Sequence, residues 1–323
     1  MVLTGLKFGI CLASWNEASA FYGGLDYSLI KPYAVLCEEL GYDTLWAPDH
    51  FLLGDAMLEC WTLLAAIAAA TKKIRIGPLL LCYSHRNPSL VAKMAATLDI
   101  ISAGRLNFGF GAGWHKDEHL AYGLGWSDEP AKRIHGMIEA IQIVKALWTQ
   151  EHVTYQGTSS STNAAVCNPK PVQKPHPPIW IGGGGEKLLL RAVANHADGW
   201  NVPALPADEY ARKLGVLKEH CERNGRQFER IEKSMETRIM VTNDEWETEK
   251  IKEWLISFSS YNIHAPPAAD ILDKYIIGNS EVCCRRIEEY QKAGVQHFTL
   301  YPLDFPSTRT VKILSQDIIP SFR

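Results

Sequence analysis

The chain has 323 residues, of which 46% are hydrophobic and 21% charged, with 24 glycines and 17 prolines. This composition is typical of a globular protein and excludes disordered, collagen-like and coiled-coil chains, and the length suits one large α/β barrel or two average domains. The formal net charge of −3 gives no basic surface for nucleic acid or anionic lipid, so neither is an expected partner.

The apolar runs and the cysteines indicate a cellular compartment. The longest apolar run, residues 63–70, is too short to cross a bilayer, and the first nine residues lack a charged stretch followed by an apolar one. The eight cysteines are scattered and form no CxxC motif. They suit reduced thiols better than disulfides or structural zinc. We therefore expect a cytoplasmic protein without a metal site.

Apolar strand-like runs alternate with stretches of helical period along the whole chain. Leu29, Tyr33, Leu36 and Leu40, for example, recur at steps of three and four, which gives a helix one apolar stripe. Strands alternating with helices indicate a parallel sheet covered by helices. We predict eight strands, at residues 7–12, 44–47, 74–81, 105–110, 179–182, 199–202, 234–241 and 296–301.

Glycines mark three of the junctions between helices and strands. Gly41, Gly104 and Gly294 each follow a predicted helix, where a left-handed residue can turn the chain into the next strand. Eight βα units without a break in composition predict a single (β/α)8 TIM barrel over residues 1–323. A doubly wound sheet is the alternative, but residues 11–15 (CLASW) lack its glycine fingerprint after the first strand.

Two segments interrupt the repeat, residues 152–178 and residues 260–278. We interpret them as insertions after strands four and seven. Loops that follow strands lie at the active face of a barrel, so each segment is either a lid over the mouth or a solvated insertion without a catalytic role.

Four successive glycines at 182–185 follow the fifth predicted strand. They let backbone N–H groups approach a ligand closely, and a helix predicted from Glu186 to Ala194 would direct its positive end toward the same point. The run therefore predicts a phosphate cradle. A plain tight turn is the alternative.

The pair Asp49 and His50 follows the second predicted strand. A histidine there can exchange a proton near neutral pH, although a structural, hydrogen-bonded histidine is the alternative. The sequence contains no nucleophile elbow, HExxH motif, paired carboxylates or P-loop. An aromatic mouth with a phosphate cradle suits a phosphorylated planar cofactor. Trp15, Trp46 and Trp114 could stack on such a ring or simply fill the top of the barrel.

Several short motifs occur in a characteristic order. They are IRIG (74–77), RNP (86–88), AKMAATLD (92–99), GRL (104–106), GAGW (111–114), PPIWIGGGG (177–185) and ADGWN (197–201). Together they resemble the bacterial-luciferase-like flavin and deazaflavin oxidoreductases, over residues 7 to about 301. The third and fourth motifs resemble the branch that uses coenzyme F420 more than the FMN branch.

The resemblance implies a TIM barrel with a deazaflavin over its mouth, commonly a homodimer, and a non-proline cis peptide near Leu79 and Leu80. Asp49 and His50 match the family's Asp-His pair, in which the histidine lies near the centre of hydride transfer. Cofactor contacts are then expected from Asp49, Leu79, Leu80, Cys82, Ala112, Gly113, Trp114, Gly182, Gly183, Gly184 and Gly185, and substrate contacts from Trp15, Trp46, Ser84 and His115.

The sequence departs from the family pattern at two places. Sugar-phosphate dehydrogenases of the family carry an acidic proton donor at the position of Trp114, so the resemblance does not predict that substrate. Similar members carry Asn and Tyr at the positions of Tyr83 and His85.

We predict an oxidoreductase that transfers a hydride between C5 of coenzyme F420 and a small organic substrate, with His50 as the acid–base group. An FMN-dependent monooxygenase is the first alternative. A flavin-binding or deazaflavin-binding protein without turnover is the second.

Overall fold

The computed structural model of the chain describes residues 5–16, 18–54, 56–261 and 274–323. Nine strands belong to the barrel: β1 (Lys7–Cys11), β2 (Thr44–Ala47), β3 (Arg75–Pro78), β4 (Leu81–Cys82), β5 (Phe108–Gly111), β8 (Ile179–Gly182), β9 (Gly199–Pro203), β10 (Glu232–Val241) and β12 (His297–Pro302). A short strand β11 (Ile276–Gly278) and a hairpin of β6 (Val153–Gln156) and β7 (Ser161–Ala165) complete the strands among the described residues.

The barrel strands form one parallel sheet in the order β3-β2-β1-β12-β10-β9-β8-β5-β4, and β11 pairs with β10. Because β3 and β4 together make the third barrel strand, its pairing with β5 nearly closes the ring, and a parallel bridge between Ile76 and Leu106 adds to this closure. The predicted TIM-barrel fold is confirmed, with all eight predicted strands in place.

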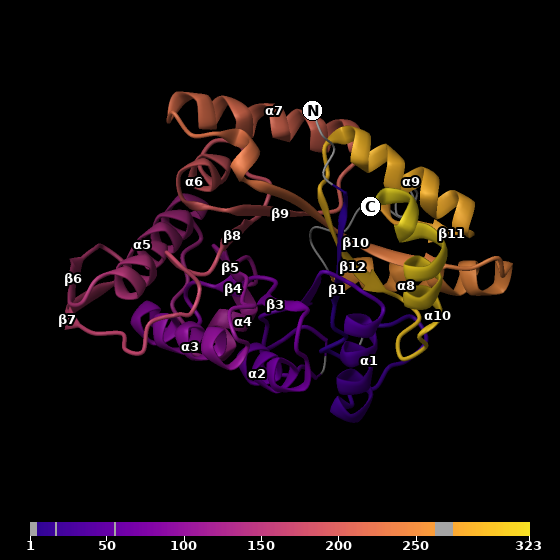
Figure 1. Cartoon of the computed structure of the whole chain (residues 1–323), viewed down its shortest axis with the longest axis horizontal. Coiled ribbons are helices and arrows are strands. Elements are labelled where there is room, and N and C mark those ends of the chain that lie inside the picture. Colours follow the sequence, from indigo (N-terminus) through magenta and orange to yellow (C-terminus); the bar gives the residue numbers. More distant parts are fainter. Residues whose placement is uncertain (1–4, 17, 55, 262–273) are drawn as a thin grey trace.

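Helices surround the sheet in Figure 1. They are α1 (Tyr27–Glu39), α2 (Cys60–Ala70), α3 (Pro88–Ile101), α4 (Lys116–Ala121), α5 (Pro130–Thr149), α6 (Leu189–His196), α7 (Ala207–Arg223), α8 (Glu245–Tyr261), α9 (Ser280–Ala293) and α10 (Arg309–Ile313). Asn87 caps the start of α3, because its side chain accepts a hydrogen bond from the Ser89 amide. Pro88 suits the first helical position, where a backbone N–H would have no partner within the helix. The junction glycines Gly41, Gly104 and Gly294 all have positive φ, as predicted.

The hydrophobic core joins the strands to the helices and also fills the barrel. Phe8 of β1 stacks on Phe298 of β12, with ring centroids 5.7 Å apart. A separate cluster of Cys11, Trp46, Leu79 and Trp180 lies in the sheet interior. Packed side chains thus close the barrel below its mouth, and a ligand can enter only from above.

The largest differences between the predicted and the observed boundaries concern two strands and one helix. The third strand divides at the cis peptide Leu79–Leu80, at the place that the family resemblance implied. The fourth begins at Phe108, because the residues before it pair with β3 only through the isolated bridge between Ile76 and Leu106. Helix α6 begins at Leu189, three residues later than predicted.

The insertion after the fourth strand does not cover the mouth, so the lid interpretation of residues 152–178 is wrong. Helix α5 returns the chain to the opposite end of the barrel, where the Pro178 carbonyl accepts from the Phe108 amide. The hairpin lies beyond α5 in Figure 1, and Tyr155 donates to Gln142 of that helix at 2.7 Å. Most of the second insertion, residues 262–273, lies outside the described residues.

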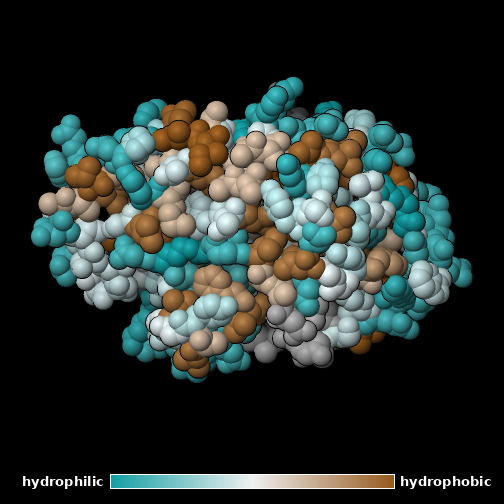
Figure 2. Space-filling model, turned by 90° about the horizontal axis from the view of Figure 1, so that it is seen from below, coloured by the Kyte–Doolittle hydropathy of each residue, from teal (hydrophilic) through white to brown (hydrophobic). Residues whose placement is uncertain are grey.

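No described helix is long and apolar enough to span a membrane. On the face shown in Figure 2, hydrophobic residues occur in small groups between hydrophilic ones. The predicted homodimer, single-domain organisation and cytoplasmic location stay predictions.

Candidate active site

A cavity of about 620 Å³ lies at the mouth of the barrel, where the strands end. Every residue predicted to contact the cofactor lines it: Asp49, Leu79, Leu80, Cys82, Ala112, Gly113, Trp114 and the glycines at 182–185. Trp15, His50 and His115 line it as well. The structure therefore brings segments from five barrel strands to one ligand-sized space.

Two of the predicted substrate residues lie elsewhere. Trp46 is fully buried in the barrel interior, where its ring centroid is 5.2 Å from that of Trp180. It does not line the cavity, because its place on β2 directs the side chain into the barrel. Ser84 is not a lining residue either, and its hydroxyl is 2.8 Å from Nε2 of His119.

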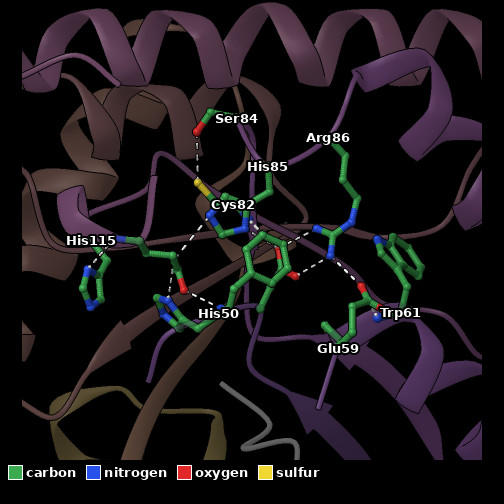
Figure 3. Close-up of polar contacts among 12 residues, drawn as sticks. His50, Glu59, Trp61, Cys82, Ser84, His85, Arg86 and His115 are labelled. Atoms are coloured by element: carbon green, nitrogen blue, oxygen red, sulfur yellow. Dashed lines mark hydrogen bonds and ion pairs between the residues drawn. The ribbon is translucent and has the colours of Figure 1, made fainter. Parts of the chain in front are cut away.

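Asp49 is held by a cation and an amide. Its two carboxylate oxygens accept from Nη1 and Nη2 of Arg86 at 2.8 and 2.9 Å, and the Cys82 amide donates to Oδ2 at 3.1 Å. Figure 3 shows that Arg86 also reaches Glu59, at 2.6 Å. Burial alone would raise the pKa of Asp49, but the neighbouring His85 and the hydrogen bonds from Arg86 lower it. Asp49 is therefore ionised at neutral pH.

His50 is oriented by Glu118 rather than by its neighbour Asp49. Nδ1 of His50 lies 3.1 Å from Oε2 of Glu118, a residue of the short helix α4. The other oxygen, Oε1, accepts from the amides of Phe51 and Leu52. Burial opposes ionisation, yet these contacts and His85 hold the pKa of Glu118 well below its usual range.

The His85 ring lies between these two carboxylates. Nδ1 is 3.4 Å from Oδ2 of Asp49, Nε2 is 3.4 Å from Oε2 of Glu118, and the side chain has no exposed surface. Burial would lower its pKa, but interactions with Asp49, Cys82 and Glu118 raise the pKa of His85 to about 11. A buried imidazolium thus holds two anions together at the edge of the cavity.

Cys82 has the properties of a thiolate. Its Sγ lies 3.3 Å from the Ser84 hydroxyl and 3.5 Å from Nε2 of His119, and Figure 3 shows Ser84 directed at Cys82. Burial would raise the pKa of Cys82, but the contacts with His119 and His85 lower it to about 6. The ligand atoms of Cys82, His85 and His119 lie within 4.8 Å of one another, a grouping that the sequence analysis did not foresee.

The glycine run forms a surface of bare backbone. A Cβ on Gly182 would lie 1.8 Å from Cδ1 of Leu80, so a side chain is excluded there. Gly183 has a φ of +119°, which favours glycine. Nζ of Lys213 donates to the Gly184 carbonyl at 3.0 Å and places a positive charge beside the run. The Gly183 amide donates to the Asn201 carbonyl at 2.9 Å, and Lys213 also pairs with Glu186 at 3.1 Å. The amides of Gly184 and Gly185, with Lys213, fit a phosphate group, and the apolar Leu80 nearby fits a planar ring.

The family assignment agrees with this geometry. The model of the luciferase-like monooxygenase family matches residues 6–297. The chain belongs to this family. It is a luciferase-like oxidoreductase with a TIM-barrel fold.

Named relatives and solved structures show what the luciferase-like oxidoreductase is similar to. An F420-dependent glucose-6-phosphate dehydrogenase of Amycolatopsis mediterranei is 26% identical over 314 residues, which cover 90% of this chain and 93% of that protein. An F420-dependent secondary alcohol dehydrogenase, solved with an F420-acetone adduct, has a TM-score of 0.83 at 22% identity, covering 99% and 100% of the two chains. Monooxygenase RslO1 of Streptomyces bottropensis has a TM-score of 0.81 at 23% identity, covering 98% and 100%.

Several residues of the luciferase-like site were not predicted. Glu118, His85 and His119 come from loops and a helix that the strand pattern does not resolve, although Glu118 lies only four residues after the GAGW motif. Glu236 and Arg238 also line the cavity. Their signal was available: both are charged residues in the predicted strand 234–241, spaced two apart and so on one face of the sheet.

Proposed function

We propose that this luciferase-like oxidoreductase transfers a hydride between C5 of coenzyme F420 and a small organic substrate. The observation that carries the proposal is the meeting of three segments at one cavity: the Leu79–Leu80 turn, the Ala112–Gly113 turn and the glycine run at 182–185. The names of the relative from Amycolatopsis and of the secondary alcohol dehydrogenase support F420 as the cofactor.

The residues of the cavity have separate roles in this proposal. The amides of Gly184 and Gly185 and the side chain of Lys213 would bind the phosphate of the cofactor. Leu79, Leu80 and Gly113 would pack against its ring and keep water away. When bound, the cofactor supplies a hydride acceptor or donor at C5 of its ring.

His50 would form a hydrogen bond with the reacting group of the substrate and take part in proton transfer. Because Glu118 accepts from Nδ1 of His50, the Nε2 atom remains available to a ligand in the cavity. The ring centroids of Trp114 and His50 are 5.2 Å apart, and this contact limits the rotation of the His50 ring. Holding reactants and an acid–base group in one geometry is the main contribution that a protein makes to hydride transfer.

Titration of the purified protein with oxidised F420 and, separately, with FMN tests the proposal. Tighter binding of F420 supports it. Tighter binding of FMN would favour an FMN-dependent monooxygenase instead, and binding of either without turnover of any substrate would favour a binding protein.

A further inference from the structure

Among the described residues, three carboxyl groups line the cavity, and only one of these three lacks a cationic partner that forms a hydrogen bond with it. Asp49 is paired with Arg86, and Glu118 lies against His50 and His85. Glu236, on β10, accepts one hydrogen bond from the neutral amide of Asn201, from Nδ2 to Oε2 at 2.9 Å. Within the described part of the chain, no other hydrogen bond is made to the Glu236 carboxyl.

Asn201 is itself fixed, which fixes the direction of this hydrogen bond. The Ser234 hydroxyl donates to Oδ1 of Asn201 at 2.9 Å, so the Nδ2 group faces Glu236. Ser234 and Glu236 are two residues apart on β10 and point to the same side of the strand. Met235 and Ile239 of the same strand belong to the hydrophobic core. Glu236 is thus held in one orientation with part of its surface open to the cavity.

The surroundings of Glu236 favour the protonated form of its carboxyl group. Cys11 of β1 and Tyr301 of β12 interact with it, and burial raises the pKa of both well above their usual range, so both are neutral. The hydrogen bond from Asn201 favours its ionisation, as do Arg238, on the same strand, and His50. Burial outweighs them and raises the pKa of Glu236, whereas the pKa values of Asp49 and Glu118 are lowered.

We propose that Glu236 is a second acid–base residue of this site and that the substrate is a carbonyl compound or the corresponding alcohol. In many enzymes, two nearby carboxyl groups have different pKa values because their environments differ. The group with the raised pKa then acts as the acid and the other stays ionised. This inference rests on the proposed function, because it requires a hydride donor or acceptor in the same cavity.

The step balances in both directions. In reduction, the carbonyl carbon of the substrate gains a hydride, the C=O π electrons move to oxygen, and the oxygen takes the proton from the Glu236 carboxyl while His50 holds the same oxygen by a hydrogen bond. Glu236 becomes a carboxylate and recovers a proton from solvent after the product leaves. In oxidation, the Glu236 carboxylate takes the alcohol proton as the hydride leaves carbon.

The first test needs no cofactor. Infrared difference spectra between wild type and Glu236→Gln report the carbonyl band of a protonated carboxylic acid. We expect this band in wild type at neutral pH, its absence in Glu236→Gln, and its loss when the pH is raised. Glu229→Gln, a change of an exposed carboxyl that precedes the same strand, should leave the band unchanged. No difference in the band between wild type and Glu236→Gln at neutral pH would overturn the proposal.

The second test measures hydride transfer in a single turnover at the deazaflavin absorbance, with reduced F420 and a panel of small ketones and aldehydes. We expect Glu236→Gln to slow the step about 10²–10⁴-fold and Glu236→Asp to recover part of the rate, with F420 affinity nearly unchanged in both. A Glu236→Gln rate within about threefold of wild type, or no turnover of any carbonyl compound by wild type, would contradict the proposal. Absence of F420 binding to wild type would instead refute the proposed function. The infrared result would still show whether Glu236 is protonated, because that test needs no cofactor.

Discussion

Nδ1 of His50 lies 3.1 Å from Oε2 of Glu118, although the two residues are 68 positions apart in the chain. Glu118 belongs to α4, in the segment that joins the fourth strand to α5, and it also accepts from two backbone amides that follow His50. The loop after the second strand and the helix after the fourth are therefore joined through one buried carboxylate. The position of the candidate acid–base residue depends on this contact.

Replacing His50 by Asn should lower the single-turnover rate of hydride transfer by about 10²–10⁴-fold, because a positioned acid–base group contributes about that much. Cofactor affinity should change little, since the phosphate and ring contacts lie on other segments. His135→Asn, on the exposed side of α5, is the control. A His50→Asn rate close to that of wild type would show that His50 only supports the barrel top.

Replacing Glu118 by Gln should destabilise the fold by about 3–5 kcal/mol, the usual cost of removing one member of a buried ionic group. The remaining His85 imidazolium would lose one of its two carboxylates. Unfolding in urea measures the loss. Glu129→Gln, whose side chain is 63% exposed in its pair with Lys132, should cost about 1 kcal/mol or less. Equal effects of the two substitutions would refute the role given to Glu118.

Cys82 should react with iodoacetamide with a midpoint near pH 6. Its contacts with His119 and His85 lower its pKa from 9.0 to about 6, whereas burial raises the pKa of the other cysteines. Because the folded pKa is the lower one, the thiolate contributes stability that is fully present above about pH 9 and is lost as the pH falls through 6. Mass spectrometry after timed alkylation identifies the modified residue.

The control for this reaction is His119→Gln, which should raise the midpoint because it removes the nearest imidazole. Saturating cofactor should slow the alkylation, since Cys82 lines the cavity. A midpoint near the ordinary thiol value in wild type would contradict the assigned contacts.

Replacing Gly184 by Asp should weaken cofactor binding at least about tenfold, or 1.4 kcal/mol, because it places a negative charge in the phosphate cradle. A Cβ on Gly184 would meet Cε of Lys213 and Cγ2 of Val202 at 3.5 Å, an ordinary contact. Gly184→Ala should therefore fold and bind almost as wild type does. If both variants bind the cofactor equally well, the glycine run does not hold its phosphate.

The fold could be predicted from sequence because its signals are local. Most strands are short apolar runs, and Gly41, Gly104 and Gly294 mark turns that need a left-handed residue. The cavity lining followed from the same rule, since residues just after parallel strands meet at one end of a barrel. The buried position of Trp46 could not be predicted in this way. The strand pattern alone does not show whether an aromatic side chain points into the barrel or toward the mouth.

The contacts of the site could not be predicted, because they join residues that are distant in the chain. His85 stands between Asp49 and Glu118 only after three strands have assembled. The hairpin at 153–165 was misplaced for a related reason: its composition shows an insertion, but only the course of α5 shows to which end of the barrel it goes. Glu236 had a local signal, a charge within a buried strand, which the prediction did not use.

The most direct test of the account is a competitive titration of the wild-type protein with oxidised F420 and FMN, followed by fluorescence of the deazaflavin. We expect F420 to bind to one site per chain, FMN to displace it only at much higher concentration, and Gly184→Asp to weaken F420 binding. Tighter binding of FMN than of F420 would contradict it.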